Sequence, residues 1–188
     1  MKMRFEELDD RTRHFMAAEF EAEERSDAAY RGERLSPSGS QAFPALMCDA
    51  IRVGDEITLI RALQRGGYWR SWECYTRDGI TRTRTINLVQ ASEQLGLSEF
   101  NTWYVRGLAR RLLEEGVEEC EVYRGALPKW EPGECSAHEG MVLPVRVVFD
   151  GHRVRYWPPP GNLGRFSIPF TPGCHHTIRR VKRLRVAV

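Results

Sequence analysis

The chain has 188 residues, of which 41% are hydrophobic and 29% are charged, and its formal net charge is +2 at pH 7. This composition is ordinary for a folded globular protein and excludes wholesale disorder. The length suits one sizeable domain or two small ones. The net charge is too small to surround the whole molecule with the basic field that dedicated nucleic-acid binders carry.

The sequence holds no apolar run of about 18 residues, so we expect no membrane-spanning helix. Residues 1–13 have no apolar core, so we expect no signal peptide. The five cysteines are an odd number spread along the chain, unlike a secreted disulfide framework. We therefore expect synthesis in a reducing cytoplasm, where thiols stay free to bind metal.

Three helices are predicted in the N-terminal part. Residues 5–24 carry apolar side chains on one stripe. Ser36-Pro37 has the cap and first-position residues of a second helix, although Pro44 argues for a later start. Gly54-Asp55 ends that helix and caps a third, which Gly66-Gly67 stops.

Residues 68–86 predict a β-hairpin. Two strand-like runs flank Asp78-Gly79, a strong two-residue turn signal. The outward residues include Arg77, Arg82 and Arg84, so one face of the ribbon is basic. Such a ribbon can contact phosphate, or it can be a solvated edge whose arginines resist aggregation.

Two helices are expected next. Asn87 caps one that ends at Gly96, and Ser98 caps the longest helix, which Gly116 ends. This pattern resembles a helix-turn-helix. The second helix, however, begins with bulky aromatic residues where base-reading polar side chains would lie, which favours a core helix: Phe100, Trp103 and Tyr104.

The C-terminal part reads as strands separated by turns. We expect strands at residues 120–123, 142–149 and 166–170, with Asp150-Gly151 turning the second into a hairpin that ends at Tyr156. Residues 157–161 must be irregular, because three successive prolines cannot join a central strand.

Soft metal ligands gather in two short motifs. Cys135-x-x-His138 opens the segment and Cys174-x-His176 closes it, with His175 as an alternative donor. Thiolate sulfur and imidazole nitrogen are the preferred ligands of zinc, so these residues predict a Cys2His2 structural zinc site. The distance between the motifs fits no standard finger. The alternative is that the cysteines are small buried hydrophobes and the histidines cap loops.

The sequence contains no phosphate-binding glycine loop, nucleophile elbow or zincin helix motif. No carboxylate pair suggests general acid–base catalysis. His152 is the one spare histidine near the motifs and could activate water in a metal-dependent nuclease, or it could be a surface turn residue. We therefore expect that the protein is not an enzyme.

Residues 98–178 resemble the C-terminal region of the Mu F-like minor head family of phage head-morphogenesis proteins. That family has a helix, a strand, a Cys-x-x-Cys followed by glycine, and a closing His-Pro-x-Cys-x-Cys. Here Ser98-Glu99 opens the helix, and Cys135-x-x-His138 with Gly140 stands at the first motif. Residues 171–176 stand at the closing motif, with Thr171 in the place of the family histidine. His138 and His176 replace family cysteines.

The resemblance implies a non-enzymatic virion protein of the phage head, made in the host bacterial cytoplasm, with capsid or portal proteins as partners. Basic residues near the C-terminus could contact packaged DNA or an acidic surface, or could be the wet side of an edge strand: Arg179, Arg180, Lys182, Arg183 and Arg185. The alternative is a zinc-knot nucleic-acid-binding or nuclease domain.

The predicted fold class is α+β. Residues 1–97 form a mainly helical region that includes the hairpin at 68–86. Residues 98–188 form the long helix and a β-rich part around the Cys/His motifs.

Overall fold

The computed structural model describes residues 2–26, 29–65, 67–127 and 134–182. Its helices are α1 (Asp10–Glu24), α2 (Pro37–Val53), α3 (Glu56–Leu63), α4 (Leu88–Glu114) and α5 (Val145–Asp150), with a short 3-10 helix η1 (Glu134–His138). Its strands are β1 (Trp72–Arg77), β2 (Ile80–Thr85), β3 (Glu119–Arg124), β4 (Val142–Pro144) and β5 (His176–Arg180). The predicted α+β class is confirmed.

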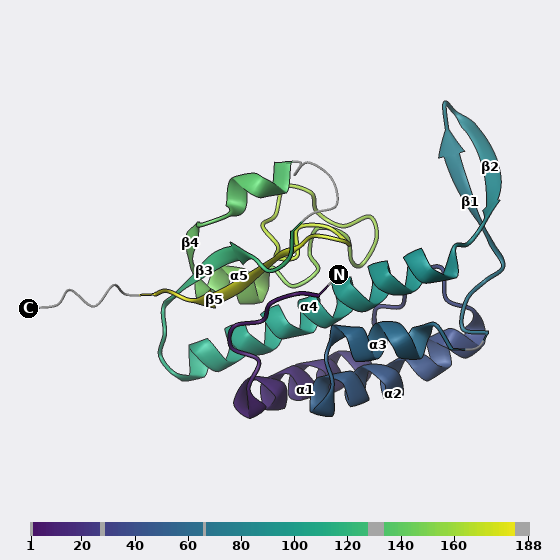
Figure 1. Ribbon diagram of the computed structural model, residues 1–188. Coiled ribbons are helices and arrows are strands. Elements are labelled where there is room, and N and C mark those ends of the chain that lie inside the picture. The colour runs from purple at the N-terminus through teal and green to yellow at the C-terminus, as the bar shows by residue number, and fades with distance from the viewer. Residues whose placement is uncertain (1, 27–28, 66, 128–133, 183–188) are drawn as a thin grey trace, which may run out of the picture.

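Helix α4 lies at the centre of the molecule (Figure 1). Helices α1, α2 and α3 lie along one side of it, and the C-terminal sheet with α5 lies on the other. Trp103, Tyr104 and Leu108 of α4 are fully buried between these layers. Burying each such side chain contributes roughly 1.5–3 kcal/mol. One hydrophobic core therefore extends over both sides of α4.

The prediction that Gly96 separates two helices is wrong, because α4 runs unbroken for 27 residues. A Cβ atom at Gly96 would lie 2.6 Å from Ile60 Cγ1 and 3.2 Å from Ile60 N. The glycine therefore allows α3 to pack closely and does not end a helix. For the same reason the resemblance to a helix-turn-helix does not hold, and the favoured core helix is confirmed, because Phe100, Trp103 and Tyr104 are buried. The expected boundary between residues 97 and 98 falls inside α4.

The capping signals of the N-terminal helices are largely confirmed. The Ser36 side chain accepts from Gly39 N at the start of α2, and Pro37 is the first helical residue. Asp55 and Thr58 form a reciprocal capping box on α3. Pro44 lies inside α2 and does not delay its start. Helix α1 starts later than residue 5, because the Asp9 side chain caps it by accepting from Thr12 N at 2.9 Å.

The predicted hairpin is confirmed as the antiparallel pair β1–β2, which we call the arm. Asp78 and Gly79 both have positive φ, 54° and 73°, as a tight hairpin turn requires. The arm projects beyond the helices (Figure 1).

The C-terminal part contains a three-stranded antiparallel sheet in the order β4-β3-β5. The strand predicted at 120–123 is confirmed by β3. The strand predicted at 142–149 is wrong beyond Pro144, where α5 begins and buries Val145 and Val148 three residues apart on one face. The hairpin ending at Tyr156 and the strand at 166–170 are also wrong, since residues 151–175 form turns and bends.

Residues 157–161 are irregular, as predicted. None of the described helices combines the length and the apolar character that crossing a bilayer requires.

Candidate metal centre

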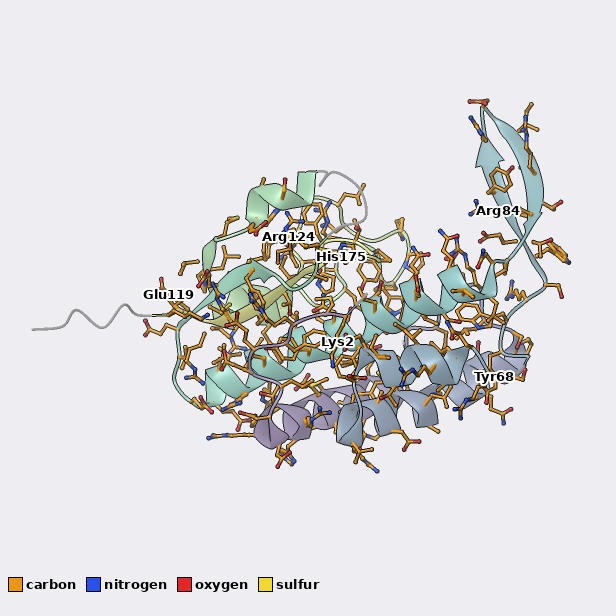
Figure 2. All side chains as sticks on the ribbon, viewed as in Figure 1. Lys2, Tyr68, Arg84, Glu119, Arg124 and His175 are labelled. Carbon is orange, nitrogen blue, oxygen red and sulfur yellow. The ribbon has the colours of Figure 1, made fainter. Side chains whose placement is uncertain are left out.

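Strand β3 brings the two Cys/His motifs to the same end of the sheet. Gly140 N, just after the first motif, donates to Val122 O at 2.8 Å. Gly125 N donates to the His175 carbonyl at 2.9 Å, and Arg124 lies opposite His176 in the strand register. Figure 2 shows Arg124 and His175 in this part of the molecule.

Cys174 and His176 form the centre of the candidate site. Both are buried, and Cys174 Sγ lies 3.6 Å from His176 Nδ1. In a tetrahedral zinc site a sulfur and a nitrogen ligand lie about 3.5 Å apart, given bonds of about 2.3 and 2.0 Å. The same distance also suits a thiol–imidazole hydrogen bond. The pair therefore has a spacing compatible with either arrangement.

Two histidine nitrogens at the candidate site are buried without a hydrogen-bond partner in the described part of the chain. One is His138 Nδ1, and the other is the second ring nitrogen of His176, Nε2. His138 is the last residue of η1, and its ring centroid lies 4.8 Å from that of Phe170. Burial lowers the pKa of His176, and the positive charge of Arg124 lowers it further. The His176 ring is therefore neutral at pH 7, which is the form that binds metal.

Glu139 lies beside the ring of His176, and Arg124 donates to Glu139. The sequence did not predict a role for either residue at this site. Glu139 Oε2 lies 3.7 Å from His176 Nε2 and accepts from Arg124 Nε at 2.9 Å. The hydrogen bond from Arg124 lowers the pKa of Glu139. A carboxylate beside the second ring nitrogen is the usual outer partner of a metal-binding histidine. Only the strand register, which the sequence does not reveal, places Arg124 here.

Three of the four predicted ligands, His138, Cys174 and His176, have side chains in the described part of the structure. Cys174 and His176 are in contact, and Glu139, the residue after His138, lies 3.7 Å from His176 Nε2. The Cys135 side chain lies outside the described part of the structure. Within that part, no three His, Cys, Asp or Glu side chains are already gathered so that they could hold one ion.

A second polar cluster lies away from these motifs and was not predicted. The Arg153 guanidinium is buried and donates to both Glu99 oxygens, at 2.9 and 2.7 Å. His152 Nε2 lies 2.9 Å from Glu23 Oε2. Burial lowers the pKa of His152 to about 4, so the ring is neutral at pH 7. The sequence placed Glu99 in a first helical turn and left His152 as either a water-activating residue or a surface turn residue, and no local pattern links the two.

The basic residues near the C-terminus are largely paired within the fold. Arg179 contacts Glu6 and Glu121, and Arg180 contacts Glu7 and Glu115. Lys182 also contacts Glu6, at 2.9 Å. Arg183 and Arg185 lie outside the described residues. Three of the five predicted phosphate-contacting residues are thus already neutralised by carboxylates.

Comparison of the chain with protein-family models, with curated proteins and with solved structures finds no match.

Proposed function

We propose that the protein is a non-enzymatic structural component of a phage head, in which a zinc ion ties the C-terminal loops together. One observation carries the proposal: the His138 loop and the Cys174–His176 segment, about 36 residues apart in sequence, return to the same end of β3. A shared zinc site of the kind that the Mu F-like resemblance implies requires this meeting of its two motifs.

The proposed ligands are Cys135, His138, Cys174 and His176. The unpartnered Nδ1 of His138 and the spacing of Cys174 Sγ and His176 Nδ1 fit such a donor set. A zinc ion with four protein ligands leaves no open position for water, so it would fix loops rather than activate a nucleophile. Residues 151–175, between α5 and β5, contain no helix or strand. A zinc ion bound at the C-terminal end of this segment would hold the segment against the sheet.

The second polar cluster supports a structural role rather than a catalytic one. Arg153 and Glu99 are hydrogen-bonded to each other, and His152 Nε2 lies within hydrogen-bond distance of Glu23 Oε2. Both His152 and Glu23 side chains are largely buried, at 16% and 15% exposure, so neither presents a free acid or base to a substrate. The cluster joins α1, α4 and the loop after α5, and its proposed role is to hold these elements in register.

The experiment is to detect the protein in particles induced from its host and separated on a density gradient. We expect it to sediment with heads that contain portal and major capsid proteins. Its presence only in the slow-sedimenting fractions would contradict the proposal. The nuclease alternative is tested separately, by incubating the purified chain with duplex DNA and Mg²⁺ or Mn²⁺. We expect no cleavage, and cleavage abolished by His152→Ala would favour the nuclease.

A further inference from the structure

The strand register divides the arm into two different faces. Residues opposite each other in antiparallel strands share a face. One face therefore presents the pairs Glu73/Arg84, Tyr75/Arg82 and Arg77/Ile80, and we call it the arginine face. The other face carries six uncharged side chains: Trp72, Cys74, Thr76, Thr81, Thr83 and Thr85.

The arm is anchored at its root and uncovered beyond it. Arg70 N donates to Arg34 O, and Glu73 accepts from both Arg34 and Arg84 at 2.6 and 2.7 Å. Every residue of β2 is exposed. A two-stranded hairpin alone is marginally stable in water, so a partner that covers the arm would stabilise it.

Charge indicates what kind of partner this is. The arm, residues 72–85, contains three arginines and two acids, a net charge of +1, and all three arginines lie on the arginine face. Arg82 has no carboxylate partner among the described residues, and Arg77 meets only the adjacent Asp78, at 3.7 Å with both side chains exposed. Arg84 lies over the Tyr75 ring, 5.0 Å from its centroid, which holds its guanidinium on the arginine face.

We infer that the arm binds duplex nucleic acid, with its arginine face toward the phosphate backbone. A two-stranded β-ribbon fits into the major groove of B-DNA, and arginine, threonine and tyrosine are common donors to phosphate oxygens. The turn at Asp78-Gly79 is the free end of the arm and enters the groove first. The contacts of Arg34 with Arg70 and Glu73 at the root fix the direction in which the arm points. This inference does not depend on the metal or on the phage head.

The test is binding of the full chain to a fluorescein-labelled duplex of about 25 base pairs, followed by fluorescence anisotropy over a range of salt concentrations. Arg77→Gln/Arg82→Gln removes two arm charges whose one carboxylate contact among the described residues is the exposed one between Arg77 and Asp78. Arg61→Gln/Arg146→Gln removes two exposed arginines from α3 and α5 and is the matched control, since the net charge changes equally. Arg77→Lys/Arg82→Lys keeps the charge.

We expect the arm variant to bind between about ten- and a hundredfold more weakly at roughly 0.1 M salt, with the slope of log K against log salt reduced by about two. The lysine variant and the control should keep most of the wild-type affinity and slope. The inference is overturned if the wild-type chain fails to bind at about 20 mM salt, or if the control loses as much as the arm variant. It is also overturned if polyglutamate displaces the chain as well as unlabelled duplex does, because the partner is then an acidic protein surface.

Discussion

Arg153 and Glu99 form a bidentate ion pair in the interior of the protein, with side chains that are only 2% and 3% exposed. The pair joins the loop after α5 to α4 across 54 positions of sequence. The Arg153 guanidinium also lies over the rings of Tyr30 and Trp103, 4.6 and 5.2 Å from their centroids. This desolvated charge pair joins the C-terminal layer to α4, and Arg153 also reaches Glu23 of α1, 3.4 Å away.

Arg153→Met should destabilise the fold by about 3–5 kcal/mol, because it leaves the Glu99 carboxylate buried without its partner. Arg153→Met/Glu99→Met should recover part of this loss, since the Glu99 carboxylate is then no longer buried without its partner. Urea unfolding measures both. The control is Arg110→Met, which loses contacts with Glu114 and Glu19; because the Arg110 side chain is 46% exposed, the cost should be about 1 kcal/mol or less. Equal losses for Arg153→Met and Arg110→Met would contradict the importance of the buried pair.

Stability should fall as the pH drops from 6.5 toward 4. Burial lowers the pKa of His152 from its ordinary 6.5 to about 4, so the folded state favours the neutral ring. This contribution is fully present above pH 6.5 and is lost as the pH falls through the folded-state pKa. Burial alone would raise the pKa of Glu23, but the hydrogen bond to His152 and the charge of Arg153 lower it to about 2, so its contribution is lost only below pH 4.5.

The measurement is the free energy of unfolding at pH 7.0, 5.5 and 4.5 for the wild type and for His152→Gln. The wild type should lose roughly 2 kcal/mol more than the variant over this range. Parallel pH profiles would show that His152 protonation is not coupled to unfolding.

Gly107→Ala should destabilise the packing of α1 on α4. A Cβ atom there would lie 2.5 Å from Met16 Cγ and 2.6 Å from Met16 N, so the backbone of α1 must move. We expect a cost of about 2 kcal/mol, despite the gain of about 1 kcal/mol that alanine offers over glycine in a helix. Gly67→Ala is the control, because no atom lies within 4 Å of the added Cβ. A stabilised Gly107→Ala protein would contradict the close helix contact.

The local signals in the sequence predicted much of the fold. Ser36-Pro37, Asp55 and Asp78-Gly79 each determine a cap or a turn through their own hydrogen bonds or φ angles, so they could be read without knowing the rest. Gly96 misled the prediction because its role is tertiary: it makes room for Ile60. The α5 segment was misread as a strand because a short apolar run fits either element, and its packing on α4 decides.

The candidate site was only partly predictable for the same reason. Cys174 and His176 are close in sequence and can be found from spacing alone. The approach of His138 and Glu139 depends on β3 pairing with both neighbouring strands. The buried cluster around Arg153 draws on α1, α4 and a loop, and no window of sequence contains all three.

The most direct test of the metal proposal is the zinc content of the chain, purified without a metal-binding tag, together with unfolding in the presence and absence of a chelator. The proposal predicts about one zinc per chain for the wild type and for the control Cys48→Ala, a free cysteine on α2 away from the site. Cys174→Ala/His176→Ala should carry almost none, and the chelator should lower wild-type stability by several kcal/mol. A metal-free wild-type protein that unfolds identically with and without the chelator would contradict the proposal.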